Sequence, residues 1–117
     1  RLARRGGIFY DPRSEKMTLT ELTAFYDALA VAKDAFGAHI TDNRVTFGAC
    51  EDALIDFEDN LEKWIDGVVA TIRARRPSTI AERDLRNNTL IRHELNCGTN
   101  MAGIAQLAMA LAVESRN

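Results

Sequence analysis

Residues 49–76 decide the fold, and they read ACEDALIDFEDNLEKWIDGVVATIRARR. Apolar side chains recur every three or four residues along this stretch, and carboxylates occupy the positions between them. That spacing is typical of an amphipathic α-helix with one side toward a core and an acidic side toward solvent. Pro77 ends the pattern, because proline cannot continue a helix. We expect the following side chains to face the core: Leu54, Phe57, Leu61, Trp64 and Val68, with Cys50 buried on the same stripe.

Two capping boxes mark the starts of two further helices. Thr18 and Thr79 are each followed, three residues later, by a glutamate, a pattern that satisfies the free N–H groups of a first helical turn. Gly37 is a natural stop for the first of these helices. Gly98 either breaks the later helical stretch or lies inside it. We predict four helical segments and no sheet larger than two short strands; the segments are 18–36, 49–76, 79–97 and 100–114.

The remaining segments complete a predicted all-α architecture, an antiparallel helical bundle of three to four helices. Residues 1–17 have no periodicity and contain the turn signatures Gly6-Gly7 and Asp11-Pro12-Arg13, so we expect an irregular basic N-terminal arm. Residues 38–47 form a polar connection that ends in a short strand-like stretch, 45–47. Residues 18–117 are predicted to form a single helical-bundle domain.

Composition excludes several classes of protein. With 117 residues, 46% of them hydrophobic, and only 7 Gly and 2 Pro, the chain is neither disordered nor fibrous. No apolar run is long enough to span a membrane, and we expect no signal peptide. Two cysteines do not make a disulfide framework. We therefore expect an intracellular, cytoplasmic protein without a membrane partner.

Charge is distributed unevenly along the chain, although the net charge is only −2. Residues 17–66 are strongly acidic, whereas residues 67–92 hold six arginines against two carboxylates. Arginine forms bidentate pairs with both carboxylate and phosphate. Three interpretations stay open: pairing within the chain, self-association between unlike faces, and phosphate contact. The candidate phosphate or nucleic-acid contacts are Arg73, Arg75, Arg76 and Arg83.

Motifs of nucleotide-using enzymes and metal sites are missing from the sequence. Neither a dinucleotide-binding glycine pattern nor a lysine-containing phosphate loop occurs. The potential metal ligands do not have zinc-site spacing; they are His39, Cys50, His93 and Cys97. We therefore expect no enzyme activity in the chain's own right, no cofactor and no metal.

His93 has the most unusual setting of the potentially reactive residues. If its segment is helical, the side chains on its face are polar or small, so we expect an exposed imidazole. Gly98 and Gly103 each cost about 1 kcal/mol within a helix, which close approach of a partner would explain. An accessible, mostly neutral imidazole can accept a phosphoryl group. An ordinary surface histidine beside a helix break is the other interpretation.

Residues 92–107 resemble the phosphoacceptor helix of histidine-containing phosphotransfer domains, and the start of this run also resembles the H-box of histidine kinases. Asn96 stands where that family has lysine, and Cys97 where glycine is commonest. The positions that match the family pattern after His93 are Leu95, Gly98, Thr99, Gly103, Ile104 and Leu107.

The resemblance implies a phosphotransfer-type signalling domain with His93 as phosphoacceptor and a receiver or kinase domain as partner. Asn96 and Asn100 would then hydrogen-bond the phosphoryl group, and Gly103 would leave room for the receiver. Arg86, two turns from His93 on the same face, would balance the added charge.

The alternative function is a self-assembling helical structural subunit that binds nucleic acid through its arginine-rich segments. Its support is the contrast between acidic and basic segments and the predominance of arginine among the cations. Helical coat proteins of rod-like plant viruses are bundles of this general kind, but no motif in the chain identifies them. An adaptor that binds another helix is a third possibility, which no sequence feature addresses.

Overall fold

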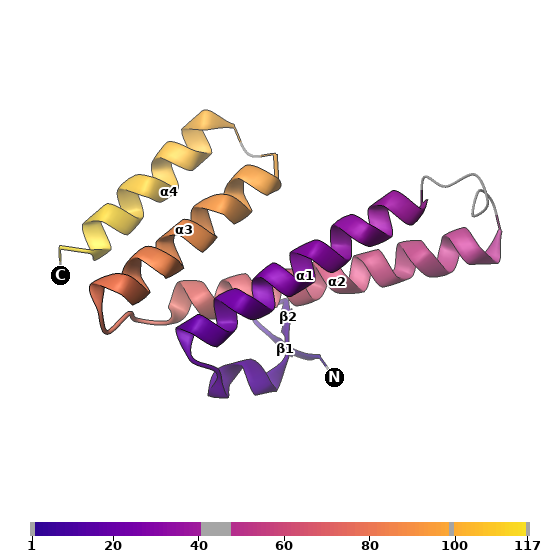
Figure 1. Cartoon of the computed structure of the whole chain (residues 1–117), viewed down its shortest axis with the longest axis horizontal. Helices are drawn as coiled ribbons and strands as arrows, with labels where there is room; N and C mark the ends of the chain where they lie inside the picture. Colours follow the sequence, from indigo (N-terminus) through magenta and orange to yellow (C-terminus); the bar gives the residue numbers. More distant parts are fainter. Residues whose placement is uncertain (1, 41–47, 99, 117) are drawn as a thin grey trace.

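The structure, a computed structural model, describes residues 2–40, 48–98 and 100–116. Within them the chain is mostly helical, and the four predicted helical segments are confirmed. α1 and α2 form a long hairpin, and α3 and α4 form a second hairpin against one end of the first (Figure 1). The elements are β1 (Ala3–Arg5), β2 (Ile8–Tyr10), the 3-10 helix η1 (Pro12–Lys16), α1 (Leu19–Ile40), α2 (Ala49–Ala74), α3 (Ile80–Asn96) and α4 (Met101–Glu114).

The helix starts follow the capping boxes. In the first box Thr18 and Glu21 exchange both bonds: each backbone N–H donates to the other residue's side chain, at 3.0 and 3.1 Å. In the second, the Glu82 N–H donates to Thr79 Oγ1, and the Glu82 carboxylate accepts mainly from the N–H and hydroxyl of Ser78. Both arrangements satisfy N–H groups that have no partner within the helix.

The two glycines that we considered as helix stops behave differently. Gly37 does not end α1, which continues to Ile40, so that expectation was wrong. Gly98 adopts φ 71°, a left-handed conformation that ends α3 and settles the open question about this helix. The strand-like stretch predicted at 45–47 lies outside the described residues.

The N-terminal segment is an ordered hairpin where we expected an irregular arm. β1 and β2 pair antiparallel, and Gly6 and Gly7 supply the positive φ angles of the two-residue turn between them. The hairpin lies against α2 at Gly67: a Cβ on this glycine would come within 2.1 Å of the Phe9 carbonyl oxygen. A strand of three residues is too short to show the alternation of polar and apolar side chains by which strands are predicted, which explains the difference.

The hydrophobic core lies where the two helical hairpins meet. Its buried members come from all four helices: Leu19, Leu22, Tyr26, Leu29, Ile65, Val68, Ile72, Leu90 and Leu111. Of the five predicted core residues of α2, Val68 is buried, while Leu54, Leu61 and Trp64 are half-buried. Phe57 is 59% exposed, and Cys50 is also exposed, so both of those predictions were wrong. The reason is that this half of α2 extends beyond the second hairpin (Figure 1).

The molecule is elongated, with principal extents of 53 × 33 × 25 Å. Its radius of gyration is 16.0 Å, compared with about 13 Å for a compact domain of this length. The distal half of the α1–α2 hairpin accounts for the long dimension (Figure 1). No helix within the described residues is both long and apolar enough to cross a membrane.

Candidate functional site

His93 lies on the side of α3 that faces α1, half-buried between two protein groups. Its Nδ1 atom is 3.4 Å from the Tyr26 hydroxyl, and the two rings meet edge to face with centroids 5.7 Å apart. Its Nε2 atom is 3.5 Å from Cys97 Sγ, one helical turn further along. Both ring nitrogens therefore have a neighbour within the chain. The imidazole is less exposed than its own helix face predicted, because Tyr26 reaches it from α1.

The surroundings of His93 favour its neutral form. Burial lowers the pKa of the imidazole, and the Lys33 ammonium acts in the same direction; the carboxylates of Asp66 and Glu94 oppose them. Burial raises the pKa of the Cys97 thiol, and the same two carboxylates add to that effect. At neutral pH the pair is thus an imidazole beside a thiol, without the thiolate that a nucleophilic cysteine requires.

The residues predicted to surround a phosphoryl group on His93 have other partners. Arg86 is buried, and Thr89, on the same predicted face, has no exposed surface at all, so the expectation of a polar exposed face was wrong. The Asn100 side chain caps α4 by accepting the Gly103 N–H at 2.9 Å. Asn96 is exposed in the last turn of α3. The assignment of a phosphoryl-binding role to these residues stays a prediction.

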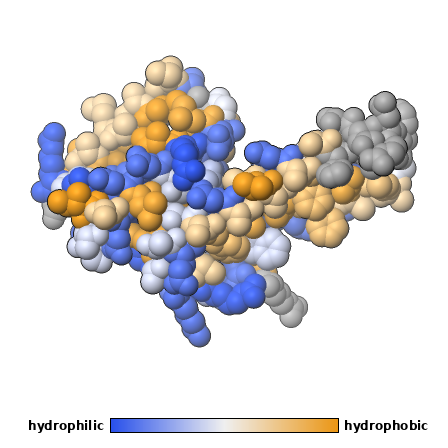
Figure 2. Space-filling model, viewed as in Figure 1, coloured by the Kyte–Doolittle hydropathy of each residue, from blue (hydrophilic) through white to orange (hydrophobic). Residues whose placement is uncertain are grey.

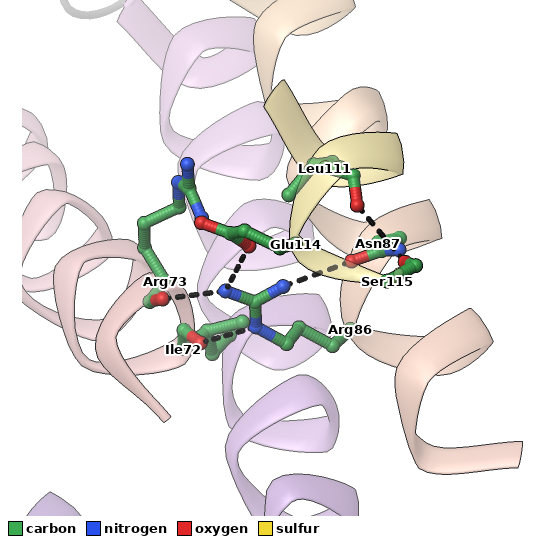
Figure 3. Close-up of polar contacts among 7 residues, drawn as sticks. All are labelled: Ile72, Arg73, Arg86, Asn87, Leu111, Glu114 and Ser115. Carbon is green, nitrogen blue, oxygen red and sulfur yellow. Dashed lines mark hydrogen bonds and ion pairs between the residues drawn. The ribbon is translucent and has the colours of Figure 1, made fainter. Parts of the chain in front are cut away.

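Arg86 connects the ends of three helices. Its guanidinium donates to the carbonyl oxygens of Ile72 and Arg73, at 3.1 and 2.6 Å, where α2 ends (Figure 3). It also contacts Asn87 and the Glu114 carboxylate at the end of α4. A cation suits the negative end of a helix dipole, and this one adds a donor to the Arg73 carbonyl and to the Ile72 carbonyl, which also accepts the Arg75 N–H. Sequence spacing gives no signal for such a contact, because the partners come from a different helix.

An arginine-lined cavity of about 500 Å³ lies at the junction of α2 and α3. All four arginines that the sequence offered as phosphate contacts line it, together with Arg86 and Glu114; the four are Arg73, Arg75, Arg76 and Arg83. Arg73 and Arg86 both pair with Glu114, and the Arg73 hydrogen bond is the main reason that the pKa of this carboxyl is lowered. The structure thus brings together arginines that are up to 13 positions apart in the sequence and a glutamate 41 positions beyond Arg73.

The outer side of α4 is an exposed apolar surface. Gln106 and Glu114 are the only residues of this helix with polar side chains, yet only Leu111 is buried. Met101 and Met109 are 78% and 70% exposed. Figure 2 shows hydrophobic colours over this part of the molecule and again along the distal half of the α1–α2 hairpin. The large apolar residues exposed in that distal half are Val31, Ile55 and Phe57.

Comparisons with models of protein families, with curated protein sequences and with solved structures gave no match. The resemblance of residues 92–107 to phosphotransfer domains therefore rests on those residues alone. Within the described part of the chain, no group of three or more His, Cys, Asp or Glu side chains is arranged to hold a metal ion. Three features remain as functional candidates: the His93 pair, the arginine-lined cavity and the outer side of α4.

Proposed function

We propose that this chain is a self-associating helical subunit whose contact surface is the outer side of α4. The supporting observation is that α4 is hydrophobic on all sides but is covered on one side only. Helices of that composition are normally buried all round. A large, continuous apolar surface on a folded protein marks a place where another molecule binds.

The total surface of the chain supports a contact of ordinary size. Its accessible surface is 7816 Å², whereas a compact monomer of this mass exposes about 6,300 Å². The surplus is roughly 1,500 Å², and a standard protein interface removes about 800 Å² from each partner. This surplus belongs to the whole elongated chain, including the distal half of the α1–α2 hairpin, and it exceeds what one such interface covers.

A second copy of the chain is the partner that this surface fits best. The outer side of α4 carries no charge, so two copies related by a twofold axis bring no like charges together. Its alanines, Ala105, Ala108 and Ala112, are small and allow the two helices to approach closely. The acidic side of α2, by contrast, would repel the same side of another copy.

Sedimentation velocity over a wide range of concentration tests this proposal. The wild-type chain should form dimers or larger species, and Ala105→Glu should remain monomeric, because it places a charge in the centre of the contact. Ala28→Glu, the same substitution at an exposed alanine of α1, is the matched control and should associate like the wild type. A wild-type chain that is monomeric at every concentration, or a control that dissociates as well, would contradict the proposal.

Phosphotransfer through His93 is the second candidate function. The observation that favours it is the lowered pKa of a half-exposed imidazole, which keeps a nitrogen lone pair available at neutral pH. A small phosphodonor such as acetyl phosphate should then give an acid-labile, base-stable phosphate on the chain. His93→Gln should abolish that phosphate, and His39→Gln is the matched control. Absence of labelling on the wild-type chain would remove this candidate.

A further inference from the structure

The arginine-lined cavity holds more positive charge than its own carboxylate can balance. Five guanidinium groups line it together with a single acidic residue, Glu114. Arg73 and Arg86 share that one carboxylate. Because like charges at close range repel, the cavity is a place where an added anion stabilises the fold.

Of the other arginines of the cavity, Arg75 and Arg76 have no carboxylate partner among the described residues, and Arg83 has one on its own helix. Arg75 donates to the backbone carbonyl oxygens of Met17 and Glu15, neutral acceptors that leave its charge unbalanced. Arg83 pairs with Asp84, the next residue along the chain, at 3.2 Å. Arg76 is exposed and makes no ion pair with any described residue. Arg76 and Arg83 are therefore the side chains most free to turn toward a ligand.

The position and shape of the cavity favour an extended ligand. A second cavity of about 420 Å³ lies beside the first and shares Arg75 and Arg76 with it. It is also lined by Arg5 and Tyr10 of the N-terminal hairpin and by Glu15, whose carboxylate pairs with Arg5. α3 begins at the first cavity, but the Ser78 and Thr79 hydroxyls there already bond within the chain. The arginines, rather than the helix start, are the groups that would bind.

We propose that these neighbouring cavities bind consecutive phosphate groups of a phosphate chain, with Arg76 and Arg83 making direct contacts. Arginine is the side chain that matches the oxygens of phosphate in a bidentate way. To balance the charges of these arginines, a ligand must place several anionic groups within the cavities. A phosphate chain meets this requirement because every phosphate carries a negative charge. Single-stranded nucleic acid and inorganic polyphosphate share this chemistry. The proposal does not depend on self-association through α4.

Fluorescence anisotropy at low salt tests the site. The probes are a labelled oligothymidylate and, as a competitor, inorganic polyphosphate; a polyglutamate peptide of equal charge is the third arm. We expect Arg76→Gln/Arg83→Gln to weaken binding at least tenfold. Arg4→Gln/Lys16→Gln removes the same charge outside both cavities and should change affinity much less. For a single strand, loss of two phosphate contacts should reduce the log–log salt slope by about 1.4.

The outcomes separate the two sources and the alternative partner. Competition that needs a large excess of polyphosphate identifies nucleic acid as the preferred source, and competition at equal concentration identifies the phosphate chain itself; either result supports the site, whereas no competition at any concentration overturns it. Absence of binding by both phosphate probes overturns the proposal. Equal binding of polyglutamate overturns it as well, because the cavity would then recognise acidic protein. The same titration on Ala105→Glu keeps the result independent of self-association.

Discussion

Replacing Gly67 by alanine should destabilise the protein, although alanine is the better helix former. A Cβ at this position of α2 would meet three backbone atoms: the Phe9 carbonyl oxygen at 2.1 Å, the Tyr10 Cα at 2.8 Å and the Phe9 carbonyl carbon at 3.0 Å. No side-chain rotation relieves a clash with backbone, so the N-terminal hairpin must move by roughly 1 Å. Overpacking of this kind costs about 1–3 kcal/mol, which outweighs the gain of about 1 kcal/mol in helix propensity.

Gly37→Ala is the matched control, because Gly37 also lies inside a helix. Among the described residues, its Cβ would meet the flexible Glu58 side chain and nothing else within 4 Å, with Oε2 at 3.4 Å. This variant should therefore gain about 0.5–1 kcal/mol. Urea denaturation followed by circular dichroism measures both. With a denaturant slope of about 1–3 kcal/mol per molar, Gly67→Ala should unfold below the wild-type midpoint and Gly37→Ala above it.

A Gly67→Ala variant as stable as Gly37→Ala would refute this reasoning. It would mean that the hairpin does not lie against α2 in solution, or that it moves away without losing stabilising contacts. Tryptophan fluorescence provides a second readout, because Trp64 lies one helical turn from Gly67. A shift in its emission only in Gly67→Ala would place the disturbance at the hairpin.

Three further outcomes are expected. Phe57→Ala should cost less than about 1 kcal/mol in the monomer, because the ring is 59% exposed and stacks on Phe36 outside the core. Leu22→Ala, in the core, should cost about 2–5 kcal/mol; equal losses in urea denaturation would contradict the assigned core. The Arg13 guanidinium holds the pKa of Asp11 far below its ordinary value, so this ion pair stabilises the fold above about pH 4 and is lost as the pH falls further. Asp11→Asn should therefore reduce the loss of stability on acidification; a stability that falls with pH as in the wild type would exclude the pair as its cause. Burial lowers the pKa of His93, so the neutral ring favours the fold and this contribution is lost as the pH falls below about 6.5; an NMR titration midpoint at or above that value would contradict the burial.

The helices could be predicted because their signals are local. Thr18 and Thr79 begin helices through bonds to residues three positions away. Pro77 follows the end of α2 and Gly98 follows the end of α3, and each has backbone preferences that do not continue a helix. Gly37 shows the limit of this reasoning. A glycine permits a stop but does not impose one, and α1 continues past it.

The core and the candidate site were harder to predict because they depend on contacts between helices. Periodicity placed Phe57 on the same stripe as Val68, but it could not show that the second hairpin covers only the latter. His93 was expected to be exposed from its own helix face, and Tyr26 of α1 changes that. The cavity was partly predictable: clustering of arginines in the sequence indicated the residues, whereas their convergence required the fold.

Arg86 has a consequence for how the protein opens. The carbonyl groups of Ile72 and Arg73 at the end of α2 accept from a guanidinium that α3 supplies, and the same guanidinium contacts the end of α4. If the second hairpin detaches, these two carbonyls lose that donor and the last turn of α2 frays more easily. Slow amide hydrogen exchange would then report one shared opening for the last turn of α2 and for α3, and a faster, separate opening for the distal half of the first hairpin. Local unfolding would thus divide the molecule within α2, and not at the loop between the two hairpins.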